Sequence, residues 1–236
     1  MKGFSIVIPC YNEKENIPLL LERFAKCIGT RRDIEVVLVD NGSTDGSGAI
    51  MDKLLPNYPF AVKAVVRENQ GYGFGIMTGL RKASGSFLGW THADLQTDPS
   101  DVIKAADLII RNGYNQNMYI KGNRKGRPFS DTFFTFGMSV LELLLTGMWL
   151  DDINAQPNLF SRSFFVTWKH PPKDFSLDLY AYYLAKKKGL EIMKFPVIFP
   201  ERLHGVSKWN TGLKAKWKFI KRTAGYSIRL TRGGIH

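Results

Sequence analysis

The sequence predicts an α/β fold of the Rossmann-like kind, in which a mostly parallel central sheet is flanked by helices. Short apolar runs alternate with helical patterns along the first half of the chain, which is the order of βαβ units. The run 34–39 is apolar at almost every position, as in a parallel strand with both faces covered by helices. Polar residues follow directly after several runs, at the strand ends where open α/β sheets bind ligands.

The first half is expected to contain strands at 4–9, 34–40, 61–66 and 86–90, each followed by a helix. Asn12-Glu13 caps the first helix and Gly29 stops it, while Pro99 opens the helix after the last of these strands. This arrangement is typical of a nucleotide-binding half of a doubly wound fold.

The second half is less regular. We expect helices at 99–111 and 177–188 and strands at 118–121, 157–161 and 191–199. The strongly apolar segment 132–150 approaches the length of a membrane span, but Glu142 lies near its middle, so a buried or interface-lying helix is expected instead. Residues 209–226 form a basic helical pattern. The predicted organisation is therefore a domain of residues 1–208 and a basic amphipathic C-terminal segment of residues 209–236.

The composition bounds the partners. The 236-residue chain has a formal net charge of +12, concentrated from Arg202 onward, which suggests nucleic acid, an anionic membrane surface or phosphorylated substrates. No recognition motif for nucleic acid accompanies the charge, so that partner is excluded. The two cysteines make no disulfide framework, and the N-terminus lacks the pattern of a signal peptide, so a cytoplasmic protein is expected.

The chain's polar centre is the segment 90–99, which follows a buried strand. His92, Asp94 and Gln96 alternate there, so in an extended segment they would point to one side. One side that carries nitrogen and oxygen donors can hold a divalent cation, and the cation can hold a diphosphate.

Three strand ends together carry a family resemblance. They read Ile-Pro-Cys-Tyr-Asn-Glu at 8–13, Val-Asp-Asn-Gly-Ser-Thr-Asp at 39–45 and Ala-Asp-Leu-Gln at 93–96. In this order, they resemble the family 2 glycosyltransferases of the GT-A fold, and within them the dolichyl- or polyprenyl-phosphate sugar synthases. The resemblance covers about residues 4–208. It implies a UDP- or GDP-sugar donor and a divalent cation, Mg²⁺ or Mn²⁺.

The resemblance also implies the residues of the donor site. Pro9, Tyr11 and Glu13 would line the base and ribose, and Asp40 would accept a hydrogen bond from one of them. The glycine-rich segment 70–75 would either let the backbone approach the donor sugar or serve packing. The full implied set for the nucleotide sugar is Pro9, Tyr11, Asn12, Glu13, Asp40, Gly42, Ser43, Gly71, Ala93 and Asp94.

The sequence departs from the family at the metal motif, because His92 replaces the first aspartate of Asp-Ala-Asp. Imidazole is a poorer ligand than carboxylate for Mg²⁺. Three roles are open for His92: it ligates Mn²⁺, it meets the diphosphate when protonated, or it hydrogen-bonds a neighbour. We assign the metal to Asp94 with help from Gln96, with His92 as a further candidate ligand.

Phosphate and acceptor residues follow from the same resemblance. Arg124 in Gly-Asn-Arg and the segment 200–208 would contact phosphates, through Arg124, Arg202, Ser207 and Lys208. Asp152 and Asp178 match family aspartates with catalytic roles, and Asp178 is a candidate base for a hydroxyl acceptor. An acceptor-associated arginine is missing after Asp152, which raises the case for a glycan acceptor.

The sequence thus predicts an inverting glycosyltransferase that acts on a polyprenyl-phosphate or lipid-linked acceptor. We expect it on the inner face of the cell membrane as a peripheral protein, bound through its basic, tryptophan-containing tail. Two alternatives are a soluble surface-polysaccharide glycosyltransferase with a sugar hydroxyl acceptor, and a nucleotide-sugar-binding protein without catalysis. The donor base, the sugar and the oligomeric state stay open.

Overall fold

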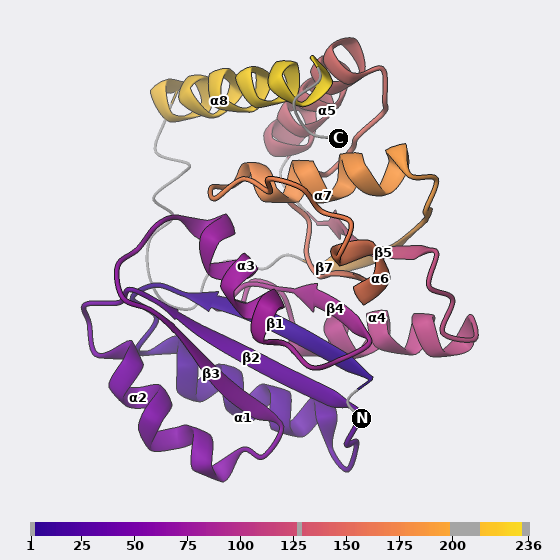
Figure 1. The fold of residues 1–236 in the computed structure, drawn as a ribbon. Helices are drawn as coiled ribbons and strands as arrows, with labels where there is room; N and C mark the ends of the chain where they lie inside the picture. Colours follow the sequence, from indigo (N-terminus) through magenta and orange to yellow (C-terminus); the bar gives the residue numbers. More distant parts are fainter. Residues whose placement is uncertain (1–2, 127–128, 199–212, 233–236) are drawn as a thin grey trace.

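The computed structural model of the chain describes residues 3–126, 129–198 and 213–232. A seven-stranded sheet lies at its centre, with the strand order β3-β2-β1-β4-β6-β5-β7 (Figure 1). All neighbouring strands pair in parallel except β6, which runs antiparallel to β4 and β5. The expected α/β fold with a mostly parallel sheet is therefore confirmed. The strands are β1 (Phe4–Cys10), β2 (Ile34–Asn41), β3 (Ala61–Val66), β4 (Phe87–Trp90), β5 (Met118–Lys125), β6 (Asn158–Ser161) and β7 (Glu191–Ile198).

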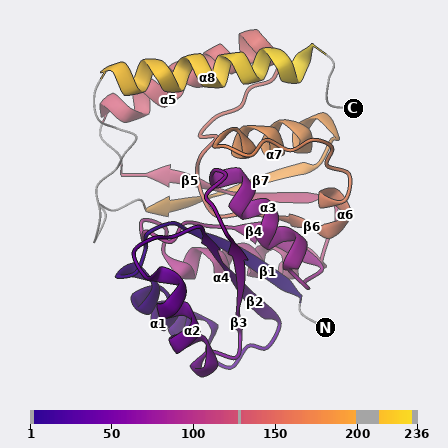
Figure 2. The same ribbon diagram turned by 60° about the vertical axis from the view of Figure 1, so that its left-hand side comes forward.

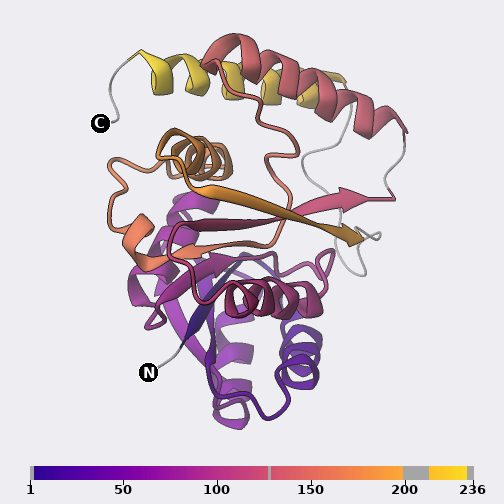
Figure 3. The ribbon, with the colours of Figure 1, turned by 90° about the vertical axis from the view of Figure 1, so that its right-hand side faces the viewer.

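Helices cover both faces of the sheet, which explains the apolar strands. In β1, Ile6 and Ile8 pack with the α1 and α4 side, whereas Val7 packs with the α3 and α7 side. Figure 3 shows α4 and α7 on opposite sides of the sheet. Besides the outer pair described below, the helices are α1 (Asn16–Ile28), α2 (Ser47–Leu54), the short η1 (Leu55–Asn57), α3 (Tyr72–Lys82), α4 (Pro99–Arg111), α6 (Arg162–Phe165) and α7 (Ser176–Lys187).

The helix expected at 99–111 is α4, and its start follows from local chemistry. The Asp98 side chain accepts a hydrogen bond from the Ser100 backbone N–H at 2.7 Å, and Pro99 occupies the first turn. An aspartate cap followed by proline satisfies or removes amide donors that the first turn leaves without partners. This helix begins directly after the polar segment at the end of β4, and so fixes where that segment ends.

Two helices form an outer layer beyond α7. Helices α5 (Phe129–Thr146) and α8 (Leu213–Thr231) lie side by side (Figures 2 and 3). Met138, Ser139 and Glu142 of α5 are buried, whereas Phe133 and Leu144 expose 67% and 78% of their surface. The apolar segment 132–150 is therefore partly buried and partly exposed. Within the described part of the chain, no helix combines the length and the apolarity that crossing a membrane would need.

A buried carboxyl group joins α5 to α8. Glu142 is fully buried, and Ser227 Oγ lies 2.9 and 2.7 Å from its two carboxyl oxygens. The same hydroxyl lies 3.1 Å from the Thr223 carbonyl oxygen. One hydroxyl proton can serve only one of these acceptors, whereas a protonated Glu142 can donate to Ser227 Oγ while Ser227 donates to Thr223. Burial correspondingly raises the pKa of Glu142 to about 7.

We expect Glu142→Gln to remove a pH dependence of stability. The pKa of Glu142 in the folded protein exceeds its unfolded value of 4.5. The protonated carboxyl group therefore stabilises the fold fully below pH 4.5, and this stabilisation is lost as the pH rises through about 7. Wild type should therefore lose about 3 kcal/mol relative to the glutamine variant between pH 4.5 and 8. Urea unfolding across this range measures the difference. The exposed Glu22→Gln is the matched control, and parallel pH curves for wild type and Glu142→Gln would contradict the assignment.

Candidate active site

The three motif segments leave the sheet at one edge, because β2, β1 and β4 are adjacent and parallel. Cys10 pairs with Asp40 at the ends of β1 and β2. The Thr91 backbone N–H donates to the Val7 carbonyl at 3.1 Å, which places the segment after β4 beside the end of β1. The structure therefore brings together the segments 11–13, 41–47 and 91–96, which are far apart in the sequence.

The first two segments are tied to each other by backbone-to-side-chain hydrogen bonds. The Asn12 N–H donates to Ser43 Oγ at 3.2 Å, and Asn12 Oδ1 accepts from the Thr44 N–H at 2.9 Å. The Glu13 N–H donates to Ser47 Oγ at 2.9 Å. Asn12 and Ser43 of the implied donor set thus fix the shape of the two loops. Tyr11 is 42% exposed on the same edge, where its ring is accessible to a ligand.

Asp40 lies at the end of β2 and is half-buried. Its Oδ1 accepts a hydrogen bond from the Ser43 N–H at 3.0 Å. A Cβ atom on Gly48 would lie 2.4 Å from Asp40 Oδ2, so the glycine leaves room for the carboxylate. Gly42 has φ +75°, and a Cβ there would lie 2.4 Å from the Asn69 backbone nitrogen. Only glycine therefore suits the turn that follows Asp40.

The glycine-rich start of α3 packs closely against the backbone of residues 172–174. A Cβ on Gly71 would lie 2.5 Å from the Lys173 carbonyl oxygen, and one on Gly73 would lie 2.5 Å from that of Pro172. The Phe74 N–H also donates to the Lys173 carbonyl at 2.9 Å. Of the two roles expected for this segment, close backbone packing is the one that these contacts describe.

Asp94 is the carboxylate at the end of β4, only 6% exposed beside the buried Ala93. Its Oδ1 accepts a hydrogen bond from the Gln96 backbone N–H at 3.2 Å. The strand ends at Trp90, and Leu95 has φ +60°. Residues 92–96 are therefore not extended, and the prediction that the alternating His92, Asp94 and Gln96 point to one side of an extended segment is wrong. Among the described residues, no three His, Cys, Asp or Glu side chains lie close enough together to hold a metal ion. The part of the chain that the structure describes thus offers Asp94 as a carboxylate ligand, but no preformed cage.

His92 lies against an aromatic side chain of α3. Its ring centroid is 5.8 Å from that of Tyr72, and Tyr72 stacks on Phe175 with centroids 4.5 Å apart. The charge of His92 also lowers the pKa of Asp178, which is otherwise raised by burial. The geometry therefore groups His92 with Tyr72 and Asp178.

Asp178 is 2% exposed and accepts two hydrogen bonds on one oxygen. The donors to its Oδ1 are the Trp90 indole N–H at 3.0 Å and Gln156 Nε2 at 2.8 Å. Gln156 Nε2 also lies 3.3 Å from the Tyr72 hydroxyl, and Asn158 Nδ2 donates to Gln156 Oε1 at 2.8 Å. Burial raises the pKa of Asp178, and the charge of Lys121 is the largest effect that opposes it. Asp178 is thus the centre of a buried hydrogen-bonded network below the strand ends.

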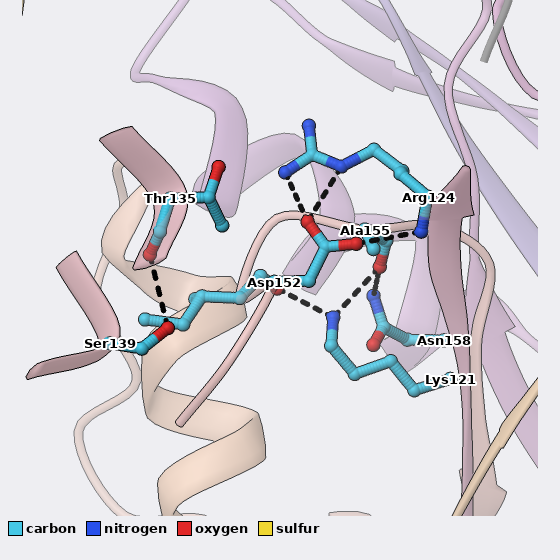
Figure 4. A network of polar contacts seen from close by, with 8 residues as sticks. Lys121, Arg124, Thr135, Ser139, Asp152, Ala155 and Asn158 are labelled. Atoms are coloured by element: carbon cyan, nitrogen blue, oxygen red, sulfur yellow. Dashed lines mark hydrogen bonds and ion pairs between the residues drawn. The ribbon is translucent and has the colours of Figure 1, made fainter. Parts of the chain in front are cut away.

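Asp152 and Arg124 form one ion pair (Figure 4). Asp152 Oδ1 accepts from Arg124 Nε at 2.8 Å and Nη2 at 2.5 Å, and Oδ2 accepts from the Arg124 backbone N–H at 2.7 Å. Burial opposes ionisation of Asp152, but the charge and hydrogen bonds of Arg124 lower its pKa. The predicted catalytic aspartate and the predicted phosphate ligand therefore contact each other. Arg202, Ser207 and Lys208 lie outside the described residues.

Sequence reasoning did not single out four residues of this network: Tyr72, Trp90, Lys121 and Gln156. Lys121 carried a usable signal, since it is a charged residue directly after the apolar run Met118–Ile120 in a predicted strand. Trp90 ends a buried strand, where its indole N–H needs an acceptor. Tyr72 and Gln156 carried no such signal, because their partners lie far away in the sequence.

Comparison with known proteins adds independent findings. The family model described as glycosyl transferase family 2 matches residues 5–155. The undecaprenyl-phosphate 4-deoxy-4-formamido-L-arabinose transferase of Pseudomonas fluorescens is 27% identical over 212 residues, covering 87% of this chain and 60% of the relative. The transferase of the same name from Proteus mirabilis is 36% identical over 132 residues, covering 54% and 40%. The chain thus spans 40–60% of the length of these two relatives.

Solved structures share the fold. The mannosyltransferase PcManGT from Pyrobaculum calidifontis, in complex with GDP-Man and Mn²⁺, aligns with a TM-score of 0.67 at 20% identity, covering 98% of this chain and 64% of that one. Glucosyl-3-phosphoglycerate synthase from Mycobacterium tuberculosis, in complex with Mn²⁺, UDP and phosphoglyceric acid, aligns with a TM-score of 0.72 at 15% identity, covering 98% and 79%. Both comparisons support the GT-A fold for this chain.

Proposed function

The chain belongs to glycosyl transferase family 2, and we propose that it transfers a sugar from a nucleoside-diphosphate sugar to a polyprenyl phosphate at a membrane surface. The observation that carries the proposal is the meeting of three motif segments at one sheet edge, all within the residues that the family model matches. The names of the relatives, which specify undecaprenyl phosphate, support the choice of acceptor.

The donor occupies the edge formed by the ends of β1, β2 and β4. Asp40 faces the nucleoside and accepts from its ribose or base, while the exposed Tyr11 lines the same end. Structural neighbours solved in complex with GDP-Man or with UDP support a GDP- or UDP-sugar donor. Asn12, Glu13, Ser43 and Gly42 hold these loops in the shape that the donor requires.

Asp94 fits the role of the carboxylate ligand of a divalent cation. Mg²⁺ and Mn²⁺ are commonly held by one or two carboxylates together with substrate phosphates, so a preformed cage is not required. Mn²⁺ in the neighbouring structures supports the same cation here. When bound, the cation would offset the negative charge of the diphosphate. Asp94 binds it with help from Gln96, while His92, which lies against Tyr72, is the weaker candidate ligand.

Transfer is proposed to be a single displacement with inversion. The acceptor oxygen forms a bond to the anomeric carbon as the bond from that carbon to the diphosphate oxygen breaks on the opposite face. A phosphate acceptor is already anionic and needs no base. Asp178, which is 2% exposed and accepts from Trp90 and Gln156, suits positioning better than proton removal, and this favours the phosphate acceptor over a sugar hydroxyl.

A transfer assay with lipid acceptors tests the proposal. Purified protein is given labelled UDP- and GDP-sugars with Mn²⁺, and either undecaprenyl phosphate or the matched alcohol undecaprenol. We expect label in the organic phase only with the phosphate. Transfer to undecaprenol instead would overturn the choice of acceptor, and no transfer with any donor would overturn the activity.

Membrane contact is assigned to the outer face of α5 and α8. Phe133, Phe136 and Leu144 of α5 and Trp217 of α8 are more than half exposed, and α8 also carries the exposed cations Lys221 and Arg229. Exposed apolar side chains beside cations suit the interface of an anionic leaflet, where each cation adds about 1 kcal/mol. We place this leaflet on the cytoplasmic face of the cell membrane.

Vesicle flotation checks the surface. The double variant Phe133→Ser/Leu144→Ser should bind vesicles of phosphatidylglycerol and phosphatidylcholine at least ~10-fold more weakly than wild type, because two exposed apolar side chains are lost. Val166→Ser, which removes a 72% exposed side chain beside α6, is the matched control. Equal binding by the double variant and wild type would refute this face as the docking surface.

A further inference from the structure

Lys121 is a fully buried lysine in β5, the strand that pairs with β6 and β7. Its Nζ donates to the carbonyl oxygens of Ile153 at 2.6 Å and Ala155 at 2.9 Å (Figure 4). It also lies 5.4 Å from the centre of the Tyr182 ring on α7. A single side chain thus joins the sheet to the segment 151–157, which we call the 151–157 loop.

The 151–157 loop carries the donor of a hydrogen bond to Asp178. Ala155, whose carbonyl accepts from Lys121, directly precedes Gln156, whose Nε2 donates to Asp178 Oδ1 at 2.8 Å. Asn158, the β6 partner of Lys121, donates to the Ala155 carbonyl at 3.3 Å and to Gln156 Oε1 at 2.8 Å. The position of Gln156, and through it of Asp178, therefore depends on where Lys121 holds the loop.

Stability alone does not explain a lysine here. Burying a charged side chain is costly, and an apolar residue of similar volume is often as stable or more so. Three other cations of the described residues contact residues 149–152 from more exposed positions. Arg124 pairs with Asp152, Lys194 pairs with Asp151, and Lys186 Nζ donates to the Trp149 carbonyl at 2.7 Å. These contacts do not include the carbonyls of Ile153 and Ala155, which lie next to Gln156 and accept from Lys121.

The charge of Lys121 also acts on the site. Burial lowers the pKa of Lys121 to about 7. The negative charges of Asp178 and Asp152 oppose this shift, whereas the positive charges of Arg124 and Lys194 add to it. Burial raises the pKa of Asp178, and the charge of Lys121 is the largest effect that lowers it, ahead of His92. The lysine therefore favours the ionised Asp178 that accepts from Trp90 and Gln156.

We propose that Lys121 is a positioning residue of the transfer site, which holds the 151–157 loop and, through Gln156, fixes the carboxylate of Asp178 beside Trp90 and Tyr72. The kinetic consequence rests on the proposed function. The effect of the Lys121 charge on the pKa of Asp178 is measurable without turnover.

The test compares Lys121→Met with Lys194→Met, which removes the half-buried lysine that pairs with Asp151. Lys121→Met should lower kcat about 10²-fold, because a small misplacement of site residues has effects of this size, while KM for the donor changes less than about 3-fold. The acid limb of its pH–kcat profile should move to higher pH, because Asp178 loses a neighbouring positive charge. Lys194→Met should show neither change. If Lys121→Met does not fold, Gln156→Met removes the same link to Asp178, and an unchanged kcat there refutes the proposal.

A spectroscopic readout separates this inference from the proposed function. The Trp90 indole N–H donates to Asp178, so its ¹H–¹⁵N NMR signal, assigned with Trp90→Phe, reports on ionisation of Asp178. We expect the titration midpoint of this signal to rise in Lys121→Met and to stay in place in Lys194→Met. If the midpoint moves but wild type transfers no sugar, the proposed function fails and the charge link stands. If wild type is active and Lys121→Met changes neither kcat nor the midpoint, the inference is overturned.

Discussion

Replacing Asp94 by asparagine is expected to lower kcat/KM for sugar transfer about 10³-fold or more while the melting temperature stays close to that of wild type. The variant loses a carboxylate that would bind the cation, and stabilisation of developing charge is commonly worth this much. The asparagine side-chain oxygen can still accept from the Gln96 N–H, so the turn after β4 is retained.

Two measurements define the result. The first is turnover with Mn²⁺ titrated from zero, and the second is the rise in melting temperature that UDP or GDP causes with Mn²⁺, which follows mass action. Asp94→Asn should lose the Mn²⁺-dependent part of both. Asp98→Asn is the matched control, because Asp98 is an exposed helix cap four residues on and asparagine caps equally well. Near-native turnover of either wild type or Asp94→Asn in EDTA would rule out the metal role.

The parts of the fold that depend on local pattern could be predicted from the sequence. The apolar run of β2 and the capped start of α4 each specify their element through neighbours in the chain. The edge of the sheet that carries the site was predictable for the same reason, since parallel strands of a βαβ unit end on one side. The position of β6 was not, because an antiparallel strand between β4 and β5 is decided by pairing across more than sixty residues of chain.

The candidate site divides along the same line. Asp40 lies at the end of β2, and Asn12 and Asp94 come shortly after β1 and β4, so their place at the edge follows from the strands. The pairing of Arg124 with Asp152 and the contact of Gln156 with Asp178 join separate elements, and no local pattern specifies them. The glycines at 71 and 73 illustrate the difference: composition indicates a close approach, but only the folded chain identifies the backbone of residues 172–174 as the neighbour.

Breaking the Arg124–Asp152 pair is expected to reduce the free energy of unfolding by about 3–5 kcal/mol, since removing one partner takes away the nearest opposite charge of the other, buried one. The two side chains are 16% and 6% exposed. Asp152→Asn is the suitable change, because Asp152 has φ +49° and asparagine tolerates this conformation better than alanine. Urea unfolding of Arg124→Met, Asp152→Asn and the double variant measures the coupling energy of the pair. The double variant should lose clearly less free energy of unfolding than the two single variants lose when their losses are added.

The exposed pair Lys26–Glu22 provides the control, with an expected coupling below about 0.5 kcal/mol. The same series decides how Arg124 acts. If Asp152 holds the guanidinium in every state, Arg124→Met should lower the free energy of unfolding and leave KM for the donor nearly unchanged. A guanidinium that leaves Asp152 to bind a phosphate would raise KM as well, because the variant then lacks a charge that the bound state uses. Single variants as stable as wild type would contradict a stabilising ion pair, and would leave phosphate binding as the role of Arg124.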